Sequence, residues 1–421
     1  MKKITAILLG AGGRGMYSYA EFALRNPEYI EFVAVAEPND ERRARFAALH
    51  NIKPENAVTS WEMLLDRSKM ADVVLICMQD KMHYEPAIKA FEVGYHVLLE
   101  KPMATSAKEC IKMGEYAQKY NRIFSICHVL RYTDFYCTVK KLIDEGRVGE
   151  IVSLNQIENV GWWHFAHSYV RGMWGNTENS GPVILTKCCH DMDILLWMID
   201  SDCTKISSFG SLRHFKESNA PEGAPDRCLD GCLHKDECKY YAPKTYLVTD
   251  KRFYPFQFML CTDQSLESRM KTLETSRYGR CVYHCDNSAA DNMVISMEFE
   301  SGVTATFSVC AFSDRCTRTL QIMGTEGEII GDLEKNEITI TEFATGRTDK
   351  IKLVEPISGH SGGDDGIMKN FINMVTNDMT GDQSLTSAKK SVQSHVMAFA
   401  AEEARVSKKV VDIAEFVDEN R

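Results

Sequence analysis

The stretch Ile4–Gly15, ITAILLGAGGRG, decides the first half of the fold. Its first six residues form a short apolar run typical of a buried strand, and three of its glycines satisfy the pattern G-x-G-x-x-G. Such glycines permit a tight turn, close approach of the backbone to a pyrophosphate, and a following helix whose amino end attracts phosphate. The turn therefore predicts a dinucleotide site, and its expected contacts are Gly10, Gly12, Gly13, Arg14 and Gly15.

Residues 1–127 repeat this strand-then-helix pattern. The expected strands are Ile4–Leu9, Phe32–Ala36, Val73–Met78, His96–Leu99 and Ile123–Cys127. The expected helices are Tyr17–Arg25, Asp40–His50, Trp61–Asp66, Tyr84–Val93 and Ser106–Tyr120. Continuous apolar strands that alternate with helices indicate a parallel sheet covered on both faces. We therefore predict an α/β protein whose amino-terminal domain, residues 1–127, is a Rossmann doubly wound parallel sheet.

The pattern changes in residues 128–421, which we expect to form a second α/β domain with a large, open and mostly antiparallel sheet. Alternating apolar residues over 293–299 and 303–309 predict two strands that each bury one face. Other expected elements are a strand at Ile151–Glu158 and helices at Asp364–Asn377 and Ser387–Ser407. Residues 213–290 show little periodicity and are rich in Cys, Pro and aromatic residues, which predicts an inserted loop region.

Composition limits the classes of partner. The 421 residues are 44% hydrophobic and 26% charged, as in a globular protein of two or three domains. The net charge of −10 provides no positive field for nucleic acid or for an anionic membrane surface. No apolar run approaches the ~18 residues of a membrane-spanning helix, and no convincing secretory signal follows Met1. We therefore expect a cytoplasmic protein with reduced cysteines and a small-molecule substrate.

An acidic residue at the end of the second strand indicates the cofactor. Glu37 stands where a carboxylate can accept hydrogen bonds from both hydroxyls of an adenosine ribose and would repel a 2′-phosphate. NAD is therefore expected in preference to NADP. Arg14 and Arg42 are close enough in sequence to accommodate a phosphate if the fold points them toward the ribose.

The tripeptide Glu100-Lys101-Pro102 directly follows an apolar strand that ends at Leu99. Ligands of open parallel sheets lie outside the carboxyl ends of the strands, so a nicotinamide ring is expected here. Pro102 biases Lys101 toward an extended backbone, and a lysine held there could orient a substrate hydroxyl or shuttle a proton. A surface lysine at a strand end is the alternative.

These pieces together resemble the glucose–fructose oxidoreductase, inositol dehydrogenase and MocA (Gfo/Idh/MocA) family. The matching segments are Gly10–Gly15, Ala87–Pro102 (AIKAFEVGYHVLLEKP) preceded by His83, and His190–Trp197 (HDMDILLW). The resemblance spans essentially the whole chain and implies a Rossmann domain followed by an α/β domain whose open sheet mediates homo-oligomerisation, as a dimer or tetramer. It also implies NAD(P)-dependent oxidation or reduction of a sugar, inositol or related polyol. The cofactor contacts expected at the strand ends are Gln79, His83, Glu100 and Lys101.

The resemblance implies a catalytic set of one lysine, one aspartate and one histidine. The lysine and the histidine correspond to Lys101 and His190, whereas the aspartate position holds Thr186, followed by Lys187. A threonine supplies no negative charge to bias the two protonation states, so the usual alcohol dehydrogenation is in doubt. Asp193, one turn after His190, could orient the imidazole or could be a surface carboxylate, and we expect Lys187 and Asp193 near the substrate.

Residues 161–174, GWWHFAHSYVRGMW, gather aromatic and polar side chains just before the expected catalytic helix. Flat aromatic faces and convergent donors suit a sugar, although an aromatic satellite core is the alternative. Expected substrate contacts are Trp163, Arg171, Trp174 and, from a later glycine-rich turn, His360. Expected additional acid–base residues are His164, His167 and Tyr169.

A cluster of cysteines marks the inserted region. Closely spaced thiolates could hold a structural Zn²⁺ that would stabilise an insertion without its own core. The expected ligands are Cys228, Cys232, Cys238, Cys281 and Cys285. The alternatives are scattered unligated thiols and an iron–sulfur cluster.

Three functions follow in order of preference. The first is an NAD-dependent oxidoreductase acting on a secondary alcohol of a sugar, inositol or glycoside, or reducing the matching ketosugar. The second, from a different reaction class, is an NAD-dependent glycoside hydrolase or lyase that works by transient ring oxidation and elimination. The third is a non-catalytic NAD-binding sensor.

Overall fold

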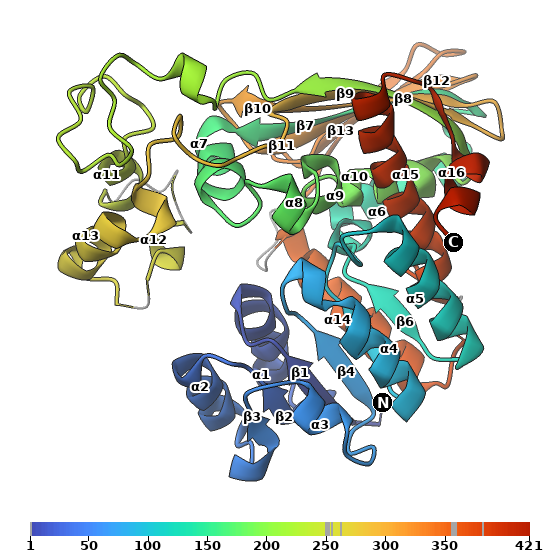
Figure 1. The fold of residues 1–421 in the computed structure, drawn as a ribbon. Coiled ribbons are helices and arrows are strands. Elements are labelled where there is room, and N and C mark those ends of the chain that lie inside the picture. The colour runs from blue at the N-terminus through green and yellow to red at the C-terminus, as the bar shows by residue number, and fades with distance from the viewer. Residues whose placement is uncertain (1, 249–252, 254–255, 262, 355–359, 381–382) are drawn as a thin grey trace.

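The structure, a computed structural model, describes residues 2–248, 253, 256–261, 263–354, 360–380 and 383–421. Figure 1 shows a parallel-sheet unit that carries the amino terminus and, above it, a unit built on a broad sheet. The inserted region projects from the broad sheet as a separate lobe around α11, α12 and α13. The chain is therefore an α/β protein with two sheets, as the sequence predicted.

The first sheet is six-stranded and parallel, in the order β3-β2-β1-β4-β5-β6. Its strands are β1 (Ile4–Leu9), β2 (Ile30–Ala36), β3 (Ala57–Val58), β4 (Val73–Ile76), β5 (His96–Leu99) and β6 (Phe124–Ile126). The helices that connect them are η1 (Gly15–Ala20), α1 (Glu21–Arg25), α2 (Asp40–His50), η2 (Pro54–Asn56), α3 (Glu62–Leu65), η3 (Asp80–Met82), α4 (Tyr84–Val93) and α5 (Ala107–Lys119). This strand order is that of a Rossmann fold, which confirms the predicted fold class.

Both faces of this sheet are buried under apolar cores. Successive side chains of a strand point to opposite faces, so they enter the two cores in turn. In β1, Ala6 and Leu8 belong to one apolar core, whereas Ile7 and Leu9 belong to the other. The strands therefore read as continuous apolar runs rather than alternating ones.

The second sheet has nine strands in the order β14-β13-β12-β11-β7-β10-β9-β8-β15, and β7 and β10 are its parallel pair. Its strands are β7 (Ile151–Gly161), β8 (Cys203–Ser211), β9 (Asn292–Phe299), β10 (Thr304–Ser313), β11 (Thr317–Gly324), β12 (Gly327–Asp332), β13 (Glu337–Glu342), β14 (Thr348–Lys352) and β15 (Val411–Asp412). Burial alternates along β9 and β10, so one face packs on helices and the other is open. The sheet is mixed and mostly antiparallel, as predicted.

Helices cover the inner face of this sheet and carry the residues that face the first unit. They are η4 (Val129–Tyr132), α6 (Asp134–Asp144), α7 (Trp162–Phe165), η5 (Ala166–Arg171), α8 (Thr177–Ser180), α9 (Val183–Thr186), α10 (Cys189–Ile199), α15 (Ala388–Ser407) and α16 (Ile413–Glu419). The short η9 (His360–Gly362) precedes α14 (Gly363–Thr376).

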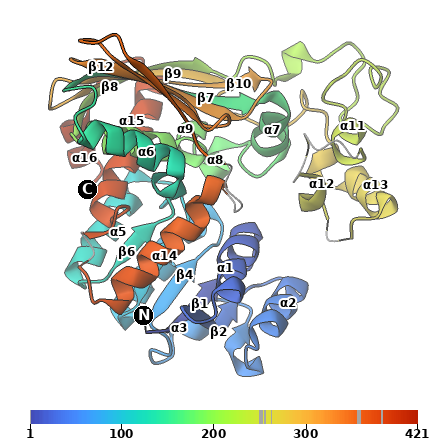
Figure 2. The same ribbon diagram turned by 180° about the vertical axis from the view of Figure 1, so that it is seen from behind.

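The helix α14 belongs by its packing to the first sheet, although it lies near the end of the chain. Figure 2 shows α14 alongside the parallel sheet. Its buried residues Ile367, Phe371 and Ile372 join the apolar core that contains Ala6 and Leu8 of β1. The two packing units are therefore not contiguous in sequence.

The inserted region is more regular than the loop that its weak periodicity suggested. It contains η6 (Glu217–Asn219), α11 (Ala242–Tyr246), α12 (Phe256–Met259), α13 (Leu266–Thr275) and η8 (Arg277–Gly279). Its helices bury a small core of their own, made of Cys228, Ala242, Tyr246, Phe256, Leu260 and Leu273. The expectation of an insertion without a core was therefore wrong. Aromatic side chains form much of this small core, and the irregular spacing of apolar residues in the sequence did not reveal it.

Truncating Phe371 tests the assignment of α14 to the first unit. Phe371→Ala removes a fully buried ring from the core beside β1, so we expect the free energy of unfolding to fall by about 3–5 kcal/mol. Denaturant unfolding measures this loss, with Lys369→Ala on the exposed face of the same helix as the matched control. A loss no larger than the control's would contradict the packing.

Candidate functional site

The glycine turn after β1 has the shape that a dinucleotide requires. Gly10 has a φ of +91°, and a Cβ there would lie 2.6 Å from the carbonyl oxygen of Cys77. A Cβ on Gly15 would lie 2.2 Å from the carbonyl oxygen of Gly10, so the helix can pack this closely only with glycine. By contrast, apart from its chain neighbours, no atom of the described residues lies within 4 Å of a Cβ built on Gly12 or Gly13. The turn is therefore closed toward the sheet and open on the side where a pyrophosphate would lie.

Glu37 anchors this turn to the end of β2. One carboxylate oxygen accepts a hydrogen bond from the backbone N–H of Ala11 at 2.8 Å, and the other accepts from Asn39 N–H at 2.9 Å. Arg42, considered as a possible phosphate ligand, lies 3.2 Å from the same carboxylate. Oε2, which accepts from Ala11 N–H, keeps a further lone pair, so the residue retains capacity for a ribose hydroxyl. The turn and this carboxylate fit NAD.

Arg14 occupies a buried ionic cluster instead of pointing toward a phosphate. Its guanidinium donates to Glu100 at 2.6 Å and to both carboxylate oxygens of Asp364 at 2.8 Å. It also donates to the hydroxyls of Ser18 and Tyr19 at 2.7 and 2.9 Å. Burial alone would raise the pKa of Glu100, but Arg14 and the Tyr19 hydroxyl hold it below its usual value. Two carboxylates already balance this guanidinium, so we do not retain Arg14 as a phosphate ligand.

The loop 100–104 is held from both sides. His83 is fully buried and its Nδ1 lies 2.9 Å from the carbonyl oxygen of Pro102. On the other side, the backbone N–H of Met103 donates to His395 Nε2 of α15 at 2.9 Å. His83 therefore acts on the backbone of this loop, and the structure does not place its imidazole in contact with a cofactor.

Lys101 projects from this loop toward the second unit. Its Nζ donates to the backbone carbonyl of Thr186 at 3.0 Å, four residues before His190. Among the described residues, no carboxylate oxygen lies within 4.0 Å of this Nζ. Thr186 thus contacts Lys101 through its backbone, without the negative charge that an aspartate would bring.

His190 lies in the first turn of α10 and is 6% exposed. Its ring packs edge to face on the ring of His128, with the centroids 5.7 Å apart. His128 lies two residues after β6, and Lys101 lies two residues after β5. Adjacent parallel strands therefore bring both residues to the same edge of the sheet.

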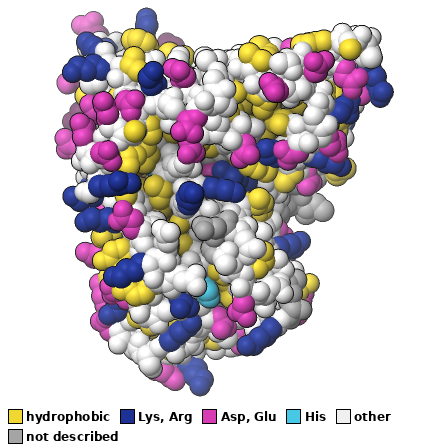
Figure 3. Space-filling view, turned by 90° about the vertical axis from the view of Figure 1, so that its right-hand side faces the viewer, with side chains coloured by type: hydrophobic (Ala, Val, Ile, Leu, Met, Phe, Trp, Pro, Cys, Tyr) yellow, Lys and Arg dark blue, Asp and Glu magenta, His cyan; other side chains and the backbone are white. Residues whose placement is uncertain are grey.

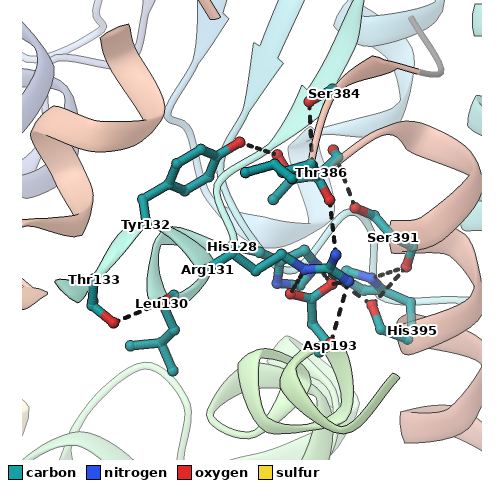
Figure 4. A network of polar contacts seen from close by, with 12 residues as sticks. His128, Leu130, Arg131, Tyr132, Thr133, Asp193, Ser384, Thr386, Ser391 and His395 are labelled. Carbon is teal, nitrogen blue, oxygen red and sulfur yellow. Dashed lines mark hydrogen bonds and ion pairs between the residues drawn. The ribbon is translucent and has the colours of Figure 1, made fainter. Parts of the chain in front are cut away.

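Asp193 is part of the interior, not of a substrate surface. Arg131 donates to both of its carboxylate oxygens, at 2.6 and 2.8 Å, and also to the carbonyl oxygen of Leu385 (Figure 4). Asp193 has no exposed surface. A buried guanidinium requires this partner, so we do not retain Asp193 as a substrate contact.

Two predicted site residues of segment 161–174 face the inserted lobe. His167 Nδ1 lies 2.8 Å from the Tyr246 hydroxyl, its ring stacks on Phe256, and burial lowers its pKa to about 3. Arg171 is buried and donates to the carbonyl oxygens of Tyr240 and Arg280 at 2.6 and 2.7 Å. The polar groups of both side chains thus bind residues of the lobe. This favours a structural role for His167 and Arg171 over the predicted role in catalysis or substrate binding.

The other residues of the segment lie between the lobe and the first unit. Trp163 stacks on His164, whose Nδ1 lies 3.4 Å from Cys316 Sγ. Burial lowers the pKa of His164, and burial raises the pKa of Tyr169, so both are neutral at pH 7. Trp174 Nε1 donates to the carboxylate of Asp80 at 3.0 Å, across the two units.

Lys187 belongs to a charge-balanced row behind this segment. Its Nζ lies 3.2 Å from the buried carboxylate of Glu158, which also pairs with Arg318 at 2.9 Å. Arg318 in turn pairs with both oxygens of Asp191 at 2.7 and 3.0 Å. The row alternates two cations with two anions, so the charge of Lys187 at the edge of the site is paired with Glu158.

Asp80 is a site residue that the sequence interpretation missed. It lies just after β4, and its carboxylate is near enough to Lys101 and His83 for both to lower its pKa, although burial raises it overall. The strand-end argument that identified Lys101 applies equally to Asp80 and could have found it. Gln79, the residue before it, is exposed, and no contact in the described structure tests its role.

The cysteines of the insertion are not grouped as a metal site in the part of the chain that the structure describes. Within the described part of the chain, no group of three or more His, Cys, Asp or Glu side chains is arranged to hold an ion. Cys228 Sγ accepts the backbone N–H of Ala242, and Cys285 Sγ contacts the carbonyl of Cys281. Burial raises the pKa of Cys281 to about 11, which keeps it a thiol. The expectation of structural zinc is therefore not supported, because packing and backbone contacts occupy these sulfurs. The side chain of His360 lies outside the described residues.

Comparisons with known proteins bear on the whole chain. One family model, described as an oxidoreductase family with an NAD-binding Rossmann fold, matches residues 4–128. A second, described as the C-terminal alpha/beta domain of an oxidoreductase family, matches residues 140–413.

Individual relatives match at lower coverage. YteT of Bacillus subtilis, a protein named as an oxidoreductase, is 22% identical over 76% of this chain and 76% of its own length. The 2,7-anhydro-N-acetylneuraminate hydratase of Escherichia coli is 30% identical over 42% of this chain and 45% of its own. The structure of levoglucosan dehydrogenase with NADH and levoglucosan has a TM-score of 0.71 at 16% identity, covering 98% of this chain and 99% of that one.

The surface carries charges of both signs. Figure 3 shows Lys and Arg side chains interspersed with Asp and Glu over the face that it presents. Within the described ranges, no helix has the length and apolarity to cross a bilayer.

Replacing Glu37 tests the cofactor assignment. We expect wild-type protein to bind NAD⁺ more tightly than NADP⁺, and Glu37→Gln to lower NAD⁺ affinity about tenfold while narrowing that gap, because a charged acceptor is lost. The glutamine keeps an oxygen for Ala11 N–H, and Glu62→Ala on exposed α3 is the control. Fluorescence titration with both nucleotides measures the affinities, and equal wild-type affinities would exclude the assignment.

Proposed function

The chain belongs to the Gfo/Idh/MocA oxidoreductase family, and on that basis we propose that it is an NAD-dependent enzyme acting on a carbohydrate. Its reaction is oxidation of a secondary alcohol of a sugar, inositol or glycoside, or reduction of the matching ketosugar. Relatives named inositol 2-dehydrogenase and 1,5-anhydro-D-fructose reductase support this class of substrate.

The observation that carries this proposal is the position of Lys101 and His190. Lys101 follows β5, and its Nζ reaches the carbonyl of Thr186, one turn before His190. Both therefore lie at the carboxyl edge of the parallel sheet, where the glycine turn directs the cofactor.

NAD⁺ bound at this edge would accept a hydride from the carbon that bears the reacting hydroxyl. Lys101 orients the reacting hydroxyl through its Nζ, which the Thr186 carbonyl holds in place. His190 takes the hydroxyl proton as general base, which requires its neutral form. Half-buried Trp174 and Trp163 offer aromatic surface for the C–H face of a sugar ring.

We further propose that the open face of the nine-stranded sheet pairs two copies in a homo-oligomer. The apolar side chains of Val152, Phe209, Val294 and Ile330 point outward from four of its strands and are 44–69% exposed. Burying them against a second copy removes this apolar area from water.

A second candidate, redox-neutral cleavage, is favoured by one specific observation. Lys101 contacts a backbone carbonyl where an aspartate would bring a charge, which departs from the family's dehydrogenase set. In such a reaction the ring alcohol is oxidised to a ketone by hydride transfer to NAD⁺, a base removes the proton on the adjacent carbon, and the glycosidic oxygen leaves as an alcohol after taking up a proton. Water then adds to the resulting double bond, a proton returns to the adjacent carbon, and the hydride finally returns to the ketone carbon. Of the predicted bases, half-buried His164 is better placed than His167, which is buried and whose Nδ1 lies 2.8 Å from the Tyr246 hydroxyl.

Removing either proposed catalytic side chain tests the first function. We expect Lys101→Ala and His190→Ala each to lower kcat/KM by ~10²-fold or more, because positioned proton transfer is lost, while NAD⁺ binding persists. Activity is measured with levoglucosan, myo-inositol and 1,5-anhydro-D-fructose, and Lys108→Ala on the exposed side of α5 is the control. Turnover close to the control's would remove that residue from the mechanism.

The fate of the electrons separates the two reactions. A dehydrogenase produces one NADH for each alcohol consumed, and this is the outcome that we expect with a free sugar. Cleavage of aryl glycosides with catalytic NAD⁺, no accumulated NADH, and deuterium from D₂O at the carbon next to the oxidised position would instead establish the redox-neutral reaction. Absorbance at the NADH band and NMR of the product sugar make the two measurements.

A further inference from the structure

Three buried imidazoles form a row behind the edge of the parallel sheet. His128 lies between His190 and His395, with ring centroids 5.7 and 5.3 Å away, both within direct ring contact. His128 and His395 have no exposed surface. Figure 4 shows His128 beside Arg131 and Asp193, with His395 reaching in from α15. The reaction proposed above assigns a role to His190 but none to His128.

Hydrogen bonds determine the protonation of His395. Its Nε2 accepts the backbone N–H of Met103, so this nitrogen carries no proton. Its Nδ1 lies 2.7 Å from the carbonyl oxygen of Ser391 and therefore carries the hydrogen. His395 is thus a neutral imidazole in one tautomer.

The same reasoning determines the tautomer of His128. The Ser394 hydroxyl donates its single hydrogen to the carbonyl of Ser391 at 2.9 Å, so toward His128 Nε2, at 3.4 Å, it can only accept. Asp193 Oδ1, 4.0 Å from the same nitrogen, also favours a hydrogen there. The hydrogen of His128 therefore lies on Nε2, and Nδ1 carries a bare lone pair.

That lone pair has no hydrogen-bond donor among the described residues, although Nδ1 is buried. A buried polar atom without a partner costs stability, so its retention calls for an explanation. The ionisable groups that surround His128 are Arg131, Asp193, His190, His395, Lys101 and Glu100. Arg131 is paired with Asp193, and Glu100 with Arg14, so these four charges cancel in pairs.

We propose that His128 is a positioning residue for His190. Its Nδ1 lone pair is the acceptor that stabilises the protonated imidazole of His190 through one buried water. A hydrogen bond to the charged form of a histidine raises its pKa, and this supplies part of the bias that the missing aspartate would have provided. The inference rests on the proposed role of His190 as proton acceptor.

The test is a titration of His190 that needs no substrate. In His128→Gln the side-chain amide keeps an N–H for the Ser394 hydroxyl but leaves no lone pair at the Nδ1 position. We expect the pKa of His190 to fall by about one unit, a typical effect of one charged hydrogen bond. NMR of histidine-labelled protein follows the titration, with His190→Gln to assign the signal, and His50→Gln, which removes a distant half-buried imidazole, should leave it unchanged.

Ser394→Ala is the second variant, because it removes the acceptor that sets the tautomer of His128 and should lower the pKa of His190 in the same direction. An unchanged His190 pKa in a variant that binds NAD⁺ normally would overturn the proposal. With a turned-over substrate, the acid limb of the kcat profile should shift downward with the pKa. The titration reports on His128 even in a protein without dehydrogenase activity, so failure of the proposed function is distinguishable from failure of this inference.

Discussion

The structure depends on the pairing of one guanidinium with two buried carboxylates from distant parts of the chain. Arg14 leaves the glycine turn and meets Glu100 after β5 and Asp364 at the start of α14. The two carboxylate side chains are each 7% exposed and require a cation beside them, since an unpaired buried ion costs several kcal/mol. The turn that would hold the cofactor, the loop that carries Lys101, and the late helix that completes the first core are thereby tied together.

Around this cluster, the candidate site is built from backbone contacts and balanced charges. His83 and His395 contact the carbonyl and the N–H of the same peptide group, between Pro102 and Met103, and the carbonyl of Thr186 accepts a hydrogen bond from Lys101 Nζ. Arg131 with Asp193 forms a neutral pair behind His190. Such an arrangement of paired charges and backbone contacts makes the polar surroundings of Lys101 and His190, the proposed reacting pair, rigid.

Much of the fold was predictable because it rests on local periodicity. The predicted bounds of β1, β5, α2 and α4 agree with the structure to the residue, since the two strands are short, mostly apolar runs and the two helices end at clear stop residues, Asn51 and Gly94. The two residues of β3, the helix α6 and the strand β8 were missed, as were the helices of the insertion. Short or irregular elements of this kind form because tertiary contacts stabilise them, and local pattern reports those contacts weakly.

The sequence by itself determined the Rossmann unit, the open second sheet and the dinucleotide turn with Glu37. These features follow from residue type and spacing within one element or turn, whereas the pairing of Lys101 with His190 was expected from the resemblance to the family. Only the tertiary structure decided that the polar groups of four predicted site residues bind other parts of the protein; these residues are Arg14, Asp193, Arg171 and His167. It also decided that Asp80 and His128 lie near the proposed reacting pair. Each of these outcomes depends on a partner far away in the chain, and spacing along the sequence carries no information about which side chain will face which.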